Sequence, residues 1–282
     1  MENIIQKRIE EYGSSNEVDY VNSIREVIQE LTLFALSKTD FFSKAAFLGG
    51  TALRIFYGLD RASEYLDFSL IKNDDSFSLD NYIDLISKTL ASFGLDVEVI
   101  NKKSIGAVQS AFVKGDTITN LINIGLDGSL SKRIGHISSI KVKIEVDTNP
   151  PEGAEYEYKT GLFPFPYRVL TYDKGSLFAG KLHALLCRNW IKGRDYYDYV
   201  FYLSHNVTPN MTLLRNSLIQ TNFLNNGTPY DINCLKKDLC SRFSQVDYEA
   251  AKSDCRAFIK DIDELSLWNS EFFIDITNQY LK

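Results

Sequence analysis

The spacing of apolar residues changes along the chain, and each change predicts a different element. Over 18–37 and 79–93 apolar residues recur at intervals of three and four, which predicts two helices with a buried face; a shorter helix is expected over 2–12. Apolar or alternating runs predict strands at 44–48, 66–71, 95–101, 107–114, 117–125 and 139–147. This order of elements predicts a mixed β-sheet flanked by helices.

The C-terminal part of the chain has a different pattern. A loop at 161–166 and a short strand at 167–171 are followed by segments that nearly all have helical spacing. The last of these carries an apolar stripe with Phe272, Phe273 and Ile276, which we expect to pack in a helical core. The sequence therefore predicts an α+β fold with two domains. Residues 1–170 would hold the mixed sheet, and residues 171–282 would form a helical bundle.

Composition narrows the functional classes. No apolar run approaches the roughly 18 residues of a membrane helix, and the first residues lack the apolar core of a signal peptide, so we expect a cytoplasmic protein without a membrane partner. The four cysteines and three histidines have no metal-ligand spacing. A net charge of −6 argues against a broad nucleic-acid-coating surface but allows a local basic cleft. The candidates for that cleft are Lys102, Lys103, Lys114, Lys141, Lys143, Lys181, Arg188, Lys192 and Arg194.

The first candidate site combines a glycine pair with an acidic strand. Gly49 and Gly50 precede a predicted helix from Thr51, and free N–H groups at such a helix start bind phosphate. On the following strand Asp67 shares a face with position 65. A carboxylate at position 65 would complete an Asp-x-Asp pair for Mg²⁺, which prefers oxygen ligands, but this chain has Tyr65 there.

Two further segments carry charged residues at regular spacing. On the strand over 139–147, Lys141, Lys143, Glu145 and Asp147 share one face, as they would on any half-buried strand with a polar outer side. Near residue 180, a leucine stripe would bury a helix and leave Lys181 and Arg188 to point toward one cleft. Asp198 follows Arg194 by four residues, so a simple ion pair along one helix is an alternative to a role in the site.

Together these motifs resemble those of the AbiEii/AbiGii toxin family, nucleotidyltransferases of the polymerase-beta-like superfamily found in bacterial toxin–antitoxin and phage-defence systems. The family's usual first motif is Gly-Gly-Thr-Ala-Leu followed by Ser-Glu-Asp-Leu-Asp-Phe. The corresponding residues here are Gly49-Gly50-Thr51-Ala52-Leu53 and Ser63-Glu64-Tyr65-Leu66-Asp67-Phe68. The family also has a strand that ends in an acidic residue, a Lys-Leu-x-Ala-Leu helix and a Gly-Arg-Asp-x-Tyr-Asp signature, which correspond to Asp147, Lys181–Leu185 and Gly193–Asp198.

The resemblance implies transfer of a nucleotide from an NTP to an acceptor hydroxyl, with a tRNA 3′ end as one acceptor and a cognate antitoxin as partner. It implies Mg²⁺ bound by Asp67 and Asp147, with Glu145 as the second choice for the third carboxylate, and Tyr65 at the position of another metal ligand. It implies that the helical domain contributes Lys181 and the Gly193–Asp198 motif to the cleft, with Asp195 or Asp198 supporting catalysis. The nucleotide-binding candidates are Gly49, Gly50, Thr51, Ser63, Lys181 and Arg188.

Tyr65 departs from the family pattern and leaves three functional classes open. A neutral phenol is a poor Mg²⁺ ligand and is bulkier than aspartate, so the chain could be an attenuated or engineered form of an active toxin. It could instead be a catalytically silent relative that binds nucleotide or RNA. The aromatic-rich C-terminal part also leaves a protein-interaction subunit as a hypothesis.

Overall fold

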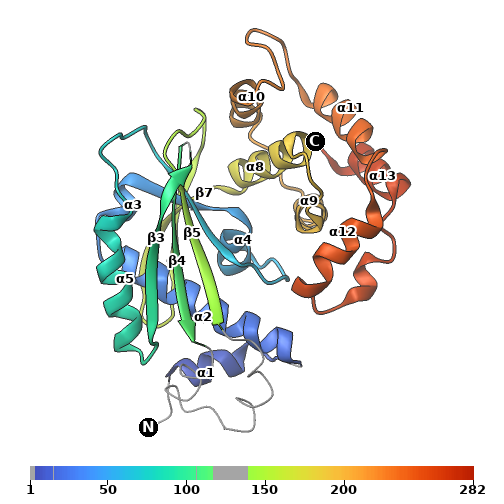
Figure 1. The fold of residues 1–282 in the computed structure, drawn as a ribbon. Helices are drawn as coiled ribbons and strands as arrows, with labels where there is room; N and C mark the ends of the chain where they lie inside the picture. The colour runs from blue at the N-terminus through green and yellow to red at the C-terminus, as the bar shows by residue number, and fades with distance from the viewer. Residues whose placement is uncertain (1–3, 15, 106, 117–138) are drawn as a thin grey trace. The chain divides into compact units, whose positions relative to one another are not determined.

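The computed structural model describes residues 4–14, 16–105, 107–116 and 139–282, without side-chain placement for residues 101–105, 116 and 139 (Figure 1). The described chain divides into two compact units. Unit 1 comprises Met1–Tyr57, Ala62–Pro150 and Tyr158–Thr171, and unit 2 comprises Gly58–Arg61, Pro151–Glu157 and Tyr172–Lys282. Two short segments that precede residue 171 therefore belong to unit 2.

The first half of the chain forms the predicted mixed sheet with helices. The sheet has the strand order β3-β4-β5-β2-β1-β7-β6, with β2 parallel to β5 and antiparallel to β1. The helices are α1 (Ile4–Glu11), α2 (Glu17–Ser37), α3 (Phe41–Lys44), α4 (Gly49–Tyr57) and α5 (Asp80–Ser92). The strands are β1 (Ala45–Leu48), β2 (Tyr65–Leu70), β3 (Val97–Ile105), β4 (Val108–Asp116), β5 (Ser139–Asp147), β6 (Tyr156–Gly161) and β7 (Tyr167–Tyr172).

Alternation along β2 and β5 determines which face of the sheet is buried. Leu66 and Phe68 on β2, and Val142 and Ile144 on β5, are buried, whereas the residues between them are more exposed. Phe68 contacts Phe41 at a ring distance of 4.9 Å, and α2 and α5 pack against this side of the sheet. The opposite face therefore carries the polar residues of both strands, including those of the candidate site.

The predicted elements of the first half are largely confirmed. The helix after the glycine pair begins at Gly49 itself rather than at Thr51, and the prediction did not include β6 or the single turn α3. The alternation of Tyr156, Tyr158 and Thr160 with charged residues is a strand signal that would have identified β6. The predicted strand at 117–125 lies outside the described residues.

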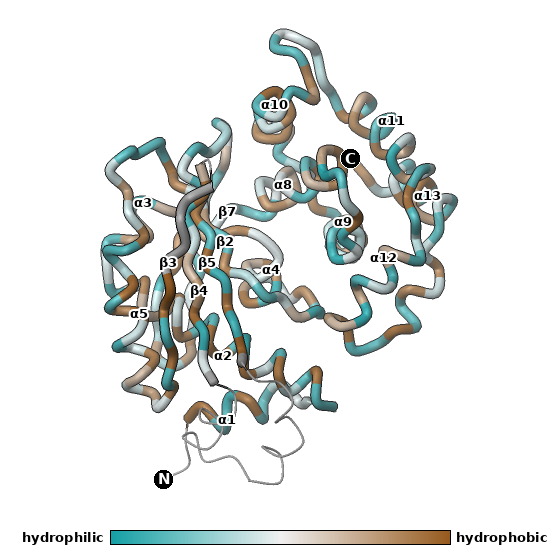
Figure 2. The backbone as a smooth tube through the Cα atoms, viewed as in Figure 1, coloured by the Kyte–Doolittle hydropathy of each residue, from teal (hydrophilic) through white to brown (hydrophobic). Residues whose placement is uncertain are grey.

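Unit 2 is helical, as predicted for the C-terminal part. Its helices are α8 (Lys174–Cys187), α9 (Gly193–Ser204), α10 (Met211–Gln220), α11 (Ile232–Phe243), α12 (Tyr248–Cys255) and α13 (Ser270–Tyr280). Hydrophobic and hydrophilic residues are mixed along these helices (Figure 2), as expected of helices with one apolar face. The apolar faces meet in an aromatic core, in which Phe178 stacks on Tyr202 at 4.4 Å and Phe243 lies 5.3 Å from Phe273.

Within the described residues, no helix is long and apolar enough to cross a membrane. The longest of them, α2, begins with an Asn16 side chain that accepts a hydrogen bond from the N–H of Asp19. Such a cap satisfies one of the free N–H groups at the helix start.

The first residue of α9 is a glycine because another backbone lies against it. A Cβ on Gly193 would lie 1.8 Å from the carbonyl oxygen of Ala251 in α12. The glycine of the Gly-Arg-Asp signature is therefore required for the close approach of two helices in unit 2.

We expect Gly193→Ala to destabilise the protein by about 1–3 kcal/mol, because the added methyl group must displace a backbone segment. Gly180→Ala is the matched control, since a Cβ at this exposed helical position meets nothing within 4 Å. This control should be neutral or stabilising by up to about 1 kcal/mol. Urea unfolding of both variants measures the difference, and equal stabilities would contradict the assigned role of Gly193.

Candidate functional site

The glycine turn and the acidic strand of the first motif are in direct contact. Leu48, the last residue of β1, is the register partner of Asp67 on β2, so the turn that follows Leu48 lies beside the aspartate. Gly49 has φ of +82°, and a Cβ placed on it would lie 2.5 Å from Oδ2 of Asp67. Any side chain at position 49 would therefore collide with the carboxylate, in a backbone conformation that already favours glycine.

Thr51 connects the start of α4 to the start of β2. Its side chain is fully buried. Its hydroxyl donates to the carbonyl oxygen of Tyr65 and lies 2.8 Å from the hydroxyl of Ser63. Both hydroxyls were predicted to bind nucleotide. In this structure these two hydroxyls bond to each other and hold the start of α4 against the start of β2. Gly50 is the second residue of α4 and is half-buried.

Helix α2 supports both halves of the motif. Gln29 donates to the carbonyl oxygen of Ser63 at 2.9 Å, and Glu26 accepts from Arg54 of α4 at 3.1 Å. Burial raises the pKa of Glu26, and the guanidinium of Arg54 opposes that rise. One face of α2 therefore holds α4 and the strand start in a fixed relation.

The pairing of β2 with β5 places a second acidic residue beside Asp67. The register partners are Tyr65 with Lys143, Asp67 with Glu145, and Ser69 with Asp147. In parallel strands, register partners project from the same face. Of the two candidates for the third carboxylate, Glu145 is thus the one opposite Asp67, and Asp147 is one pair further along.

Glu145 and Asp147 have different surroundings. Glu145 forms an ion pair with Lys143 at 2.6 Å, with both side chains partly exposed. Burial raises the pKa of Asp147, although the N–H of Asn149 donates to it at 2.9 Å and acts in the opposite direction. The roles predicted for Asp67, Glu145 and Asp147 in binding metal stay predictions.

The donor set on this face is small but of the right chemistry for Mg²⁺. In the described part of the chain, no group of three or more His, Cys, Asp or Glu residues is arranged to hold a metal ion. Asp67 and Glu145 provide two carboxylates on adjacent strands. Because Mg²⁺ is commonly held by one or two carboxylates together with substrate phosphates and water, this pair fits the ion.

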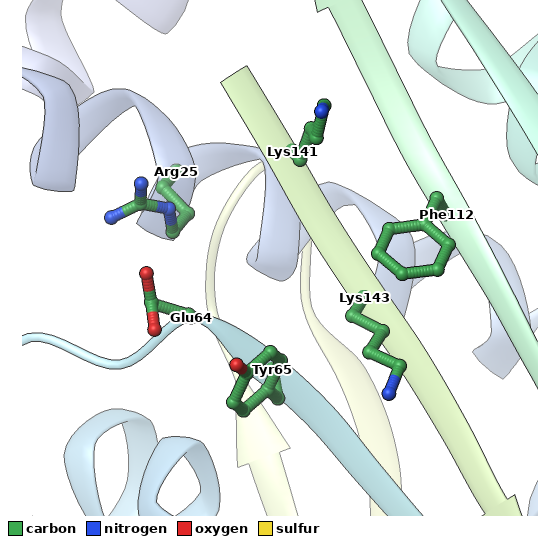
Figure 3. A pocket seen from close by; sticks show the side chains of 6 residues that line it. All are labelled: Arg25, Glu64, Tyr65, Phe112, Lys141 and Lys143. Carbon is green, nitrogen blue, oxygen red and sulfur yellow. The ribbon is translucent and has the colours of Figure 1, made fainter. Parts of the chain in front are cut away.

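Beside this pair, Tyr65 contributes to a cavity of about 270 Å³. Figure 3 shows its lining: Arg25, Glu64, Tyr65, Phe112, Lys141 and Lys143. The residue at the position where the sequence motif predicts a metal ligand is thus part of a pocket with aromatic and cationic walls.

In unit 2, the residues predicted from the third motif form a buried ionic cluster. Nζ of Lys181 lies 2.6 Å from Oδ1 of Asp195 and 2.7 Å from Oδ2 of Asp198. Arg188 contacts the second oxygen of Asp195 at 2.6 Å. Arg61 holds both oxygens of Asp198, each at 2.6 Å. Three cations thus share two carboxylates, which leaves one positive charge in excess.

Arg61 was not predicted from the sequence. It is buried and lies in the Gly58–Arg61 segment, which follows α4 in the chain but belongs to unit 2. Its partner Asp198 is 137 residues away. No local spacing signals such a pair; the only available hint is an arginine between the two halves of the first motif.

The cluster keeps its members charged despite burial. Burial alone would raise the pKa of Asp198, but Arg61 and Lys181 outweigh it and hold that pKa below its ordinary value. Burial would lower the pKa of Lys181, but Asp195 and Asp198 raise it. At nearby Lys192 burial lowers the pKa to about 8, although the charge of Asp195 acts in the opposite direction.

Two local expectations about this region were wrong. Helix α8 ends at Cys187, so Arg188 reaches Asp195 from an extended position and not from the helix. Asp198 does not pair with Arg194 along α9, because Arg194 contacts Asp254 at 3.6 Å instead. The leucine stripe itself is confirmed, since Leu182, Leu185 and Leu186 are buried. The side chains of Lys102 and Lys103 lie outside the described part of the structure.

We expect Asp198→Asn to destabilise unit 2 by about 3–5 kcal/mol, because it removes the charge that pairs with buried Arg61 and Lys181. Asp254→Asn is the matched control. Asp254 is 33% exposed and its pair with Arg194 is longer, so its loss should cost less than about 1 kcal/mol. Chemical denaturation compares the two, and a smaller effect at Asp198 than at Asp254 would contradict the cluster's structural role.

The same cluster predicts an acid dependence. The pKa values of Asp195 and Asp198 are lower in the folded state than their ordinary values, so these groups contribute stability above about pH 4 and lose it as the pH falls through the folded pKa. The stability difference between the parent protein and Asp198→Asn should therefore shrink below about pH 4. Denaturation midpoints measured from neutral pH downward test this, and a constant difference would refute it.

Comparisons with known proteins show the fold and the family of this chain. The chain resembles MenT4, a nucleotidyltransferase toxin from Mycobacterium tuberculosis H37Rv, with a TM-score of 0.52 and 16% identity, covering 100% of this chain and 99% of that one. It also resembles a protein from H. pylori assigned as a nucleotidyltransferase, with a TM-score of 0.50 and 16% identity, covering 91% and 92% of the two chains. At this identity the likeness shows the fold. No curated protein matches. Residues 31–273 match the nucleotidyl transferase AbiEii toxins of type IV toxin–antitoxin systems, and the chain belongs to that family.

Proposed function

We propose that this chain transfers a nucleotide from an NTP to a hydroxyl at a tRNA 3′ end, and that Tyr65 attenuates the reaction. Membership of the family supports an NTP substrate, an antitoxin partner and typical metal dependence. The single observation that carries the proposal is the contact between the Gly49 turn and the Asp67 carboxylate. This contact fits a site in which phosphates and a metal-binding acid must be neighbours.

The chemistry follows from what these groups can bind. The first N–H groups of α4 have no partner within the helix, and together with the helix dipole they attract phosphate oxygens. Asp67 and Glu145 would hold Mg²⁺, which neutralises phosphate charge and polarises the reacting phosphorus. The acceptor hydroxyl oxygen bonds to the α-phosphorus, pyrophosphate leaves, and the hydroxyl proton passes to a nearby base. Because Glu145 is assigned to the metal, Asp147 is the candidate for that base.

The ionic cluster of unit 2 is proposed to contribute charge. Lys181 and Arg188 each contact Asp195, and the cluster has an excess of one positive charge. A triphosphate would neutralise that excess, which supports the prediction that Lys181 and Arg188 bind nucleotide. Asp195 and Asp198 would then act as positioning residues, because they hold the Lys181 amine in one place.

Tyr65 favours a second candidate function, in which the chain binds nucleotide or RNA without catalysing transfer. The phenol replaces a charged ligand with a neutral one, and the Nζ of its register partner Lys143 lies 5.9 Å from its ring. A cation over an aromatic face is favourable, so the ring has a stable place where an aspartate would bind metal. With Tyr65 at this position, the fold of unit 1 and the contact between Gly49 and Asp67 are both present.

We expect Tyr65→Asp to increase transfer of label from α-labelled NTPs to total tRNA in the presence of Mg²⁺. A restored metal ligand supplies several kcal/mol of transition-state stabilisation, which corresponds to about a hundred-fold or more in rate. Expression of the variant should also arrest bacterial growth.

Tyr65→Asn is the matched control, because it removes the ring and adds a side chain of aspartate's size without its charge. It should be as slow as the parent, and Asp67→Asn in the Tyr65→Asp background should abolish the gain. Equal activity of the parent and Tyr65→Asp would mean that the phenol is tolerated. Transfer by neither protein would reject tRNA as the acceptor.

A further inference from the structure

Four strands of unit 1 place their side chains in rows across the exposed face of the sheet. One row consists of Ile100, Phe112, Lys143 and Tyr65, each the register partner of the next on β3, β4, β5 and β2. The adjacent row, two residues along each strand, contains Asp67. The first row therefore runs directly beside the proposed catalytic carboxylate.

This face is open where the opposite face is covered. Ala111, Val142 and Ile144, which alternate with the row residues, are buried under the side occupied by α2 and α5. Ile100 is 38% exposed, and Phe112, Lys143 and Tyr65 are partly exposed. Apolar and aromatic side chains thus remain accessible on a regular β-sheet surface.

The cavity at Tyr65 combines two aromatic rings with an excess of cations. Nζ of Lys143 lies 5.8 Å from the ring of Phe112 and 5.9 Å from the ring of Tyr65. Arg25 and Lys141 add two further cations, and Glu64 is the one acid among the lining residues (Figure 3). The lining residues thus carry an excess of two positive charges, of which that of Lys143 is also paired with Glu145 at 2.6 Å, in a chain whose net charge is −6.

This combination matches the chemistry of a nucleotide within a flexible strand. Exposed aromatic rings on a sheet stack with unpaired bases, and neighbouring lysines and arginines contact the phosphates. In a duplex the base faces are stacked on one another, so these rings cannot stack on them. We propose that this surface binds the single-stranded end of the acceptor RNA, with bases against Phe112 and Tyr65 and phosphates near Lys141 and Lys143. The choice of RNA as the ligand rests on the proposed function.

The proposal gives Tyr65 a role of its own. At this position an aspartate would add negative charge to the pocket and take away one of its two rings. The phenol instead extends the row from Phe112 toward Asp67, so a substitution that weakens metal binding strengthens the surface for bases. Binding of single-stranded RNA and transfer of a nucleotide are therefore separable properties of this chain.

The test is binding of a short, fluorescently labelled single-stranded RNA, measured by anisotropy without Mg²⁺ or NTP, so that no transfer can occur. Phe112→Leu keeps an apolar side chain but removes the ring, and should weaken binding about 5- to 150-fold. Phe112→Tyr should bind as the parent does. Thermal unfolding of each variant identifies any that fails to fold, and Lys141→Gln provides an independent variant at an exposed position.

Lys141→Gln should weaken binding and reduce the slope of log affinity against log salt by about 0.7, because one phosphate contact is lost. Lys88→Gln is the charge-matched control, since Lys88 is exposed on α5, which packs on the covered side of the sheet. It should leave both affinity and slope unchanged.

Each of three RNA-binding results would overturn the proposal: no RNA binding by the folded parent, equal binding by Phe112→Leu and Phe112→Tyr, or equal effects of Lys141→Gln and Lys88→Gln. Binding of a free NTP that depends on Phe112, with no such dependence for the RNA, would assign the pocket to the nucleotide substrate and also overturn it. If single-stranded RNA binds as expected but the labelled-NTP assay shows no transfer to tRNA, the result would support this inference and count against the proposed catalysis.

Discussion

The contact between Gly49 and Asp67 is the constraint on which the candidate site depends. A carboxylate oxygen occupies the space of a missing Cβ, so the turn must be glycine and the strand must hold its aspartate at that register. Thr51 and α2 reinforce the arrangement through buried hydrogen bonds and one ion pair. These contacts join the two halves of the first motif to each other and to α2.

The ionic cluster of unit 2 keeps buried charged groups in place by pairing them with each other. Taking a lysine and two aspartates out of water is costly unless each is paired. Here Arg61 and Arg188 complete the pairing of the two aspartates, and those aspartates raise the pKa of Lys181 and hold its amine in place. The arrangement also explains why Gly193 and Asp195 belong to one signature. The glycine lets α9 approach α12, and the aspartate two residues later then lies in the cluster.

The side chain and the backbone of Tyr65 make separate contacts. Its backbone accepts the hydrogen bond from Thr51 whatever the side chain is. The side chain faces Lys143 and a cationic, aromatic cavity. The proposed use of this face, in which Tyr65 weakens metal binding and favours aromatic, phosphorylated ligands, requires no change on the buried side of β2.

Hydrophobic periodicity by itself determined most of the elements, the mixed sheet and the helical C-terminal part, because burial on one face imposes a period of two on strands and of about 3.6 on helices. Gly49, Asp67 and Lys181 could be selected as candidates because the short motifs around them resemble those of a known family, and their roles stay predictions. Tertiary structure alone decided the rest. The register of β2 with β5 placed Glu145, and not Asp147, opposite Asp67. Packing brought Arg61 to Asp198 across 137 residues and directed Arg194 to Asp254. Such pairs depend on where separate elements meet, and no spacing along the chain encodes that.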